Sequence, residues 1–140
     1  MSKPQKIIKK MFDQDAFSQW LGIEIMEVKD GHCKLKMAVR KEMLNGFHIS
    51  HGGISYSLAD TALAFASNTH GKKCISIETS ISHTECVQEG DILIATTKEL
   101  SRTEKMGLYL ITITNQDKKD IAYFKGTVYR TSKDWFSEIE

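Results

Sequence analysis

The stretch from Leu44 to Ala66 contains the residues whose types and spacing could do chemistry. A loop ends in His51-Gly52-Gly53 and passes directly into an apolar run that carries a single acid, Asp60. The free N–H groups at a helix N-terminus are donors for a carbonyl oxygen that becomes negatively charged, and glycines let a ligand approach them closely. A carboxylate held against an apolar helix can act as a base or a nucleophile. The pairing is therefore suited to thioester hydrolysis.

The spacing of these two features predicts how many chains form one site. Gly52 and Asp60 are eight positions apart, which is roughly 12 Å along one helix at about 1.5 Å per residue. One thioester does not easily touch both. If both act on the same carbonyl, two copies of the helix must run past one another, so that Gly52 of one chain faces Asp60 of the other. The sequence thus predicts a two-fold dimer with two composite sites.

The spacing of apolar residues along the chain predicts the helices and strands that must position these residues. The small and apolar residues from Gly52 to about Asn68 predict a helix that is buried on most sides. An amphipathic helix is expected over residues 6–20, ended by Leu21-Gly22. Strands are expected over residues 23–28, 33–39, 74–83, 92–100, 107–114 and 121–129, with Asp30-Gly31 as a tight turn between the first two. This order predicts an α+β fold in which an antiparallel sheet wraps one long central helix.

Composition limits the domain count and the partners. The 140 residues, 41% of them hydrophobic, predict a single domain over 1–140, with residues 1–20 as a helical lead-in. A net charge of +1 argues against nucleic acid and membrane partners. Three cysteines, Cys33, Cys74 and Cys86, have no CxxC spacing, which favours a reducing compartment. With no long apolar run and no cleavage signature, a cytoplasmic protein is expected.

Three motifs together resemble the signature of the hotdog-fold acyl-CoA thioesterases, specifically the phenylacetic acid degradation (PaaI-like) type. They are Asn45-Gly46, His51-Gly52-Gly53 and Ser57-Leu58-Ala59-Asp60-Thr61. The resemblance covers most of the chain, from about Ala16 to Arg130. One segment departs from it: His83-Thr84-Glu85-Cys86 stands where many members have a basic residue and a proline. This departure bears on the substrate range more than on the reaction.

The resemblance implies a role for each matching residue. Asp60 would be the general base or nucleophile, and the Gly52 N–H would polarise the thioester carbonyl. Asn45 would position the water or the thioester, and His51 would order the loop and the helix start. Gly53, Thr61 and Ser76 are the substrate-binding candidates.

The resemblance also implies the substrate and the assembly. The substrate would be an acyl-CoA with an aryl-acetyl, hydroxyphenylacetyl or medium-chain acyl group. Dimers would pair into a homotetramer. No metal and no redox cofactor is required, because coenzyme A arrives as part of the substrate.

Alternative interpretations remain open at this point. His48 and His51, three positions apart, have no further ligand placed with them that would make a metal site. Arg102 and Lys105 could meet CoA phosphates, although a charged hairpin turn is the commoner explanation. A hotdog hydratase or dehydratase would need a histidine paired with an acid across the interface. An acyl-CoA-binding module that does not hydrolyse its ligand is the third possibility.

Overall fold

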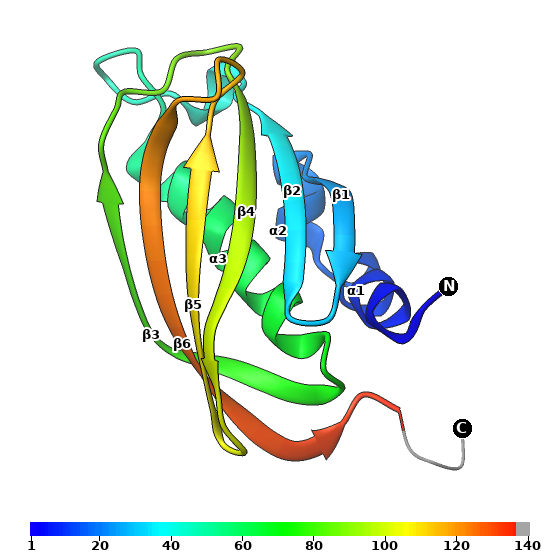
Figure 1. The fold of residues 1–140 in the computed structure, drawn as a ribbon. Helices are drawn as coiled ribbons and strands as arrows, with labels where there is room; N and C mark the ends of the chain where they lie inside the picture. Colours follow the sequence, from blue (N-terminus) through cyan, green and yellow to red (C-terminus); the bar gives the residue numbers. More distant parts are fainter. Residues whose placement is uncertain (137–140) are drawn as a thin grey trace.

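The computed structural model describes residues 1–136 and places one long helix, α3 (Gly52–Asn68), against a six-stranded antiparallel sheet (Figure 1). The strands are β1 (Glu24–Lys29), β2 (His32–Ala38), β3 (Lys72–His83), β4 (Ile92–Arg102), β5 (Met106–Thr114) and β6 (Asp120–Asp134). Their order is β1-β2-β4-β5-β6-β3, so β1 and β3 are the edges. The predicted α+β architecture is confirmed. The last part of the predicted domain, residues 137–140, lies outside the described residues.

Helix α3 is buried because small and branched apolar residues occupy the face that it turns to the sheet. Leu58, Ala59, Ala62 and Leu63 have no exposed surface. The approach to β6 is so close that a Cβ at Gly126 would overlap the side chain of Leu63. The glycine on β6 therefore allows the helix to lie this deep in the sheet. Neither α3 nor any other helix within residues 1–136 has the length and hydropathy needed to cross a membrane.

The N-terminal segment corrects one prediction, because residues 6–20 do not form a single helix. Two helices occupy it, α1 (Lys3–Asp13) and α2 (Ala16–Leu21). Ser2 and Gln5 form a reciprocal capping box, which starts α1 earlier than the apolar pattern indicates. The Asp15 carboxylate then accepts a hydrogen bond from the Ser18 N–H at 3.0 Å and begins a second helix. Local capping therefore outweighs the continuous apolar period.

Strands β3 to β6 are longer than their apolar alternation predicts, whereas β1 and β2 have the predicted lengths and are shifted by one residue. The register of β3 with β6 runs from Lys72 opposite Asp134 to His83 opposite Ala122, beyond the predicted ends at 74 and 129. The added residues are mostly polar, and backbone pairing holds them in the sheet whatever their hydropathy. The two-residue turn between β1 and β2 is as predicted, with Gly31 at φ 69°.

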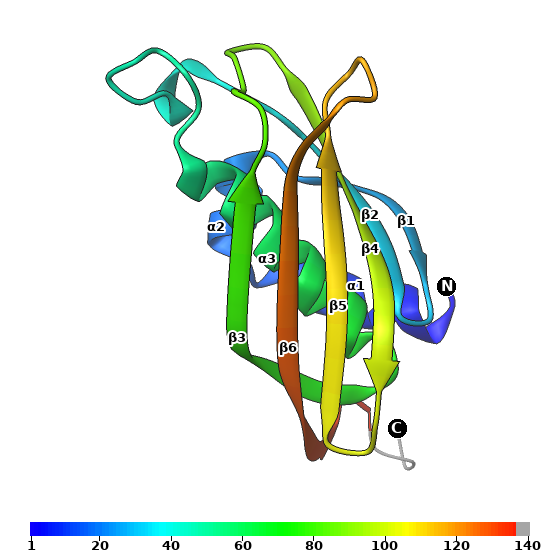
Figure 2. The same cartoon turned by 60° about the vertical axis from the view of Figure 1, so that its left-hand side comes forward.

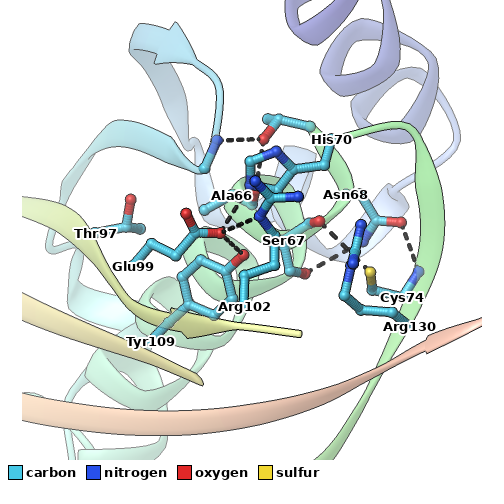
Figure 3. A network of polar contacts seen from close by, with 12 residues as sticks. Ala66, Ser67, Asn68, His70, Cys74, Thr97, Glu99, Arg102, Tyr109 and Arg130 are labelled. Carbon is cyan, nitrogen blue, oxygen red and sulfur yellow. Dashed lines mark hydrogen bonds and ion pairs between the residues drawn. The ribbon is translucent and has the colours of Figure 1, made fainter. Parts of the chain in front are cut away.

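A polar cluster fixes the C-terminal end of α3 to the sheet, and Figure 3 shows it from close by. His70, just after the helix, contacts Glu99 of β4 with 2.7 Å between Nε2 and Oε1. The Tyr109 hydroxyl of β5 donates to the same oxygen at 2.7 Å, and Arg102 Nε lies 3.4 Å from it. Burial opposes the charge on Glu99, but these hydrogen bonds and cations outweigh it and lower its pKa below 4.5. This end of the helix is thus anchored to β4 and β5.

The opposite end of α3 lies beside loops. Figures 1 and 2 both show its first turn next to the loop that precedes it and the loop that joins β3 to β4. These loops connect elements that the sheet holds in place. Residues of both loops can therefore meet at the start of the helix.

Candidate active site

The first turn of α3 presents free backbone donors. His51 is the N-cap residue, with φ −56° and ψ 139°, and its side chain makes no capping hydrogen bond. The Ile54 N–H donates to the His51 carbonyl at 3.0 Å. Within residues 1–136 no hydrogen bond engages the N–H of Gly52 or Gly53, and both glycines are exposed. A ligand oxygen can therefore reach two N–H groups at the positive end of the helix dipole.

The loop before α3 is ordered by Asn45 and by the backbone of His51. Asn45 Oδ1 accepts hydrogen bonds from the N–H of Phe47 at 2.9 Å and of Ile49 at 3.4 Å. The His51 N–H donates to the Met43 carbonyl at 2.9 Å. Within residues 1–136, His51 contacts this loop through its backbone, and its ring makes no capping hydrogen bond. Because Oδ1 of Asn45 is engaged, its amide Nδ2 is the atom left to meet a ligand.

A cavity of about 340 Å³ opens at this helix start. Its walls come from the loop and first turn over residues 45–55 and from residues 83–87, which comprise the last residue of β3 and the start of the next loop. His83 belongs to this wall, and a Cβ at Gly52 would lie 3.0 Å from its Nε2 atom. The sequence reasoning gave His83 no partner. The available indication was its place in the segment that departs from the family pattern.

Asp60 lies apart from this cavity, one to two helical turns further along α3. Its carboxylate is half-buried and has no hydrogen-bond partner within residues 1–136. Burial raises the pKa of this carboxyl above its ordinary value of 3.8. It shares an incompletely covered face of the helix with Gly53, Ser57 and Ala64. One protomer therefore does not bring Gly52 and Asp60 to the same point, as the helix geometry predicts.

The structure does not place the other two polar candidates at the cavity. Thr61 is 8% exposed, and its hydroxyl lies 3.0 Å from the hydroxyl of Ser18 in α2. This contact uses part of the hydrogen-bonding capacity of the Thr61 hydroxyl, which can both donate and accept. Ser76 is exposed on the edge strand β3. Of the predicted residues, the cavity wall contains Asn45 and Gly52.

A larger groove of about 480 Å³ lies between α1 and β1. Its walls are mostly apolar and include Ile8, Phe12, Ile25 and Met26. The helix N-terminus beside it, that of α1, is capped by Ser2 and Gln5, so we assign the chemistry to the smaller cavity. Within residues 1–136 no group of three His, Cys, Asp or Glu side chains is placed to hold a metal ion.

An antiparallel sheet wrapped around one central helix, with free donors at the helix start, defines the hotdog class of proteins. Residues 47–122 match the model of the Thioesterase superfamily, and the chain belongs to this family. The fold and the enzyme class predicted from the sequence, a hotdog-fold thioesterase, are thereby confirmed.

Individual relatives agree with this assignment. The chain is 41% identical to a protein of Archaeoglobus fulgidus named "Putative esterase", over 94% of this chain and 85% of that protein. It is 37% identical to the acyl-coenzyme A thioesterase PaaI of Escherichia coli, over 86% of each. The structure of the E. coli PaaI protein from the phenylacetic acid degradation operon matches with a TM-score of 0.92 and 34% identity. That match covers 94% of this chain and 96% of the other.

Proposed function

We propose that this thioesterase hydrolyses acyl-CoA to the free acid and coenzyme A. The observation that carries the proposal is the pair of unengaged N–H groups, on Gly52 and Gly53, at a cavity that opens onto the start of α3. The similarity to an acyl-coenzyme A thioesterase supports the choice of substrate class.

In the proposed reaction the thioester carbonyl oxygen accepts a hydrogen bond from the Gly52 N–H. The partner's Asp60, ionised, removes a proton from water, and the water oxygen attacks the carbonyl carbon. The alternative is direct attack by the carboxylate, which forms an anhydride that water then hydrolyses. In both routes the C–S bond breaks and coenzyme A leaves as the thiol. The raised pKa of Asp60 suits a base, because a more basic carboxylate accepts a proton more readily. The amide of Asn45 would position the water or the thioester.

The composite site requires a dimer, and two surfaces of the protomer support one. The incompletely covered stripe of α3 contains Asp60 and the small residues Gly53, Ser57 and Ala64, which allow a second helix to approach closely. Strand β3 is a sheet edge whose Ile75 and Ile77 side chains are 61% and 57% exposed. A long edge with apolar side chains is a surface for pairing with another strand. We propose that two protomers pair here and that two such dimers form a tetramer.

The same proposal covers the acyl group of the substrate, the cofactor requirement and the cellular compartment. Aryl-acetyl, hydroxyphenylacetyl and medium-chain acyl groups are the proposed substrates. Coenzyme A enters with the substrate, and we propose no metal or redox cofactor. Three free cysteines, one of them exposed, suit a reducing compartment such as the cytoplasm.

The test is release of free thiol from phenylacetyl-CoA, 4-hydroxyphenylacetyl-CoA and octanoyl-CoA by the wild type and by Asp60→Asn. We expect the wild type to release thiol and the variant to lose kcat by about 10²-fold or more, since a general base contributes this much. Undiminished kcat in Asp60→Asn would overturn the role of Asp60. Binding of acyl-CoA without thiol release by the wild type would favour a sensor, and addition of water to a 2-enoyl-CoA without thiol release would favour a hydratase.

A further inference from the structure

We propose that His83 is a catalytic residue that donates a second hydrogen bond, from Nε2, to the thioester carbonyl oxygen. This inference rests on the proposed thioester hydrolysis. It concerns the segment His83-Thr84-Glu85-Cys86, in which the chain departs from the pattern of many family members. Neither the spacing nor the family motif points to His83, and only the folded chain brings it to the helix start.

The backbone of His83 is held firmly at the end of the sheet. His83 is the last residue of β3, and its Cα pairs with Ala122 of β6. The next residue, Thr84, donates its N–H to the Ile121 carbonyl at 2.9 Å. The ring therefore projects from a fixed position on the strand end, and the cost of ordering its backbone is met by the sheet before any ligand binds.

The ring lies against the first residue of α3. A Cβ built on Gly52 would lie 3.0 Å from Nε2, 3.4 Å from Cε1 and 3.7 Å from Cδ2. The edge of the imidazole that carries Nε2 thus occupies the space a side chain at position 52 would need. The N–H of Gly52 leaves the same residue and is unengaged within residues 1–136. A strand end and a helix start therefore bring two polar groups to one wall of the cavity.

The ring nitrogens of His83 are not committed elsewhere. No hydrogen bond or ion pair within residues 1–136 involves its imidazole. The imidazole is therefore unpaired in the described part of the chain, even though polar groups line the rest of the cavity. Glu85, the carboxylate nearest in sequence, lies 3.1 Å from Lys119 Nζ and is neutralised there. Glu85, the carboxylate that could draw the imidazole out of the cavity by a hydrogen bond, is thus already paired. Nε2 remains available to a ligand.

The chemistry follows from the donors that meet at this wall. A neutral imidazole with its proton on Nε2 is a single hydrogen-bond donor, and the protonated ring retains that donor. When water or a carboxylate adds to the carbonyl carbon, the π electrons move to the oxygen, which becomes an anion. The His83 ring is exposed and only its backbone is held by the sheet. Two donors, the Gly52 N–H and His83 Nε2–H, would stabilise this anion more than the uncharged ground state. Collapse of the anion then expels the coenzyme A sulfur.

Three substitutions separate donation from packing. His83→Phe retains an aromatic ring against Gly52 but has no donor. His83→Gln places an amide nitrogen close to the position of Nε2, whereas His83→Asn places it near the position of Nδ1. We expect kcat for thiol release to fall by roughly tenfold to a hundredfold in His83→Phe and His83→Asn, with KM changed by less than about threefold. His83→Gln should keep most of the wild-type kcat. Thermal melting of each variant reports whether it folds.

Binding is measured separately through Cys86, which is exposed in the same cavity wall, whereas Cys33 is buried and Cys74 is half-buried. Alkylation of Cys86, followed by peptide mass spectrometry, should be slowed by a non-hydrolysable thioether analogue of acyl-CoA. The protection should be equal in the wild type and in His83→Phe, because the donor acts on the transition state. Loss of protection in the variant would place His83 in ground-state binding and overturn the assignment.

The remaining outcomes distinguish this inference from the function on which it rests. If the wild type releases thiol and His83→Phe has an unchanged kcat, only the proposed role of His83 is overturned. Equal losses in His83→Gln and His83→Phe also overturn it, because they assign the effect to the ring rather than to the donor. No thiol release from the wild type overturns the proposed function together with the role of His83.

Discussion

Among single residues, Asp60 combines features that oppose the stability of the protomer. Its carboxylate is half-buried among apolar helix residues and has no hydrogen-bond partner within residues 1–136. Burial without a partner disfavours the charged form, which is why its pKa is raised. A residue kept in an unfavourable local environment is a common sign of function, since structural acids are usually paired.

We therefore predict that Asp60→Asn raises the melting temperature at pH 7 by a few degrees while it removes activity. The raised pKa means that the folded chain binds the proton more tightly than the unfolded chain. The stability gained from protonation is fully present below about pH 3.8 and is lost as pH rises through the folded pKa. The difference between variant and wild type should thus grow from pH 4 to pH 8 in melting scans.

The control is Asp117→Asn, which removes an exposed negative charge in the turn between β5 and β6. It should leave the melting temperature nearly unchanged over the same pH range. A lower melting temperature for Asp60→Asn at pH 7 would indicate that Asp60 supports the fold, and would contradict the prediction.

Among the elements, the start of α3 has a backbone geometry that allows one N–H group to be removed selectively. Proline is favoured in the first turn of a helix because the N–H that it lacks has no partner in the helix. The preceding residue, His51, has an extended ψ of 139°, which a following proline requires. Gly52→Pro should therefore preserve the helix and delete the proposed donor.

Gly52→Ala is the matched control, because it adds the same Cβ beside His83 but keeps the N–H. We expect both variants to melt within a few degrees of each other. Thiol release by Gly52→Pro should be lower than by Gly52→Ala by about 10²-fold, the usual cost of losing one donor to the oxyanion. Equal turnover by the two variants would show that this N–H does not act on the substrate.

For the whole molecule, the decisive feature is the separation of the donor from the acid. The cavity wall contains Gly52 but not Asp60, and the acid lies on a helix face that the protomer leaves incompletely covered. In an isologous pair each of the two sites would take its donor from one chain and its acid from the other. Two chains with different defects would then restore one intact site.

We predict that co-expression of Gly52→Pro and Asp60→Asn chains restores activity that neither has alone. Random pairing makes half of the dimers mixed, and each mixed dimer has one intact site. Activity should therefore reach about a quarter of the wild-type value. Thiol release by the purified mixture, with size-exclusion chromatography to check the assembly, measures this. A mixture no more active than its parents would mean that each site is built within one chain.

The sequence by itself determined the central helix and the free backbone donors at its start. The run of small and apolar residues predicts α3, which begins at Gly52 and ends at Asn68. The His-Gly-Gly motif predicts the free N–H groups that the structure shows at its start. These features are readable because helix period, end glycines and backbone donors are local properties of a few consecutive residues.

Only the tertiary structure decided which distant groups meet. His83 reaches Gly52 because the register of β3 with β6 ends the strand beside the helix start. The Thr61 hydroxyl lies 3.0 Å from that of Ser18, which stands 43 positions earlier in the chain. Contacts of this kind depend on strand register and on packing between elements, which hydropathy period does not encode.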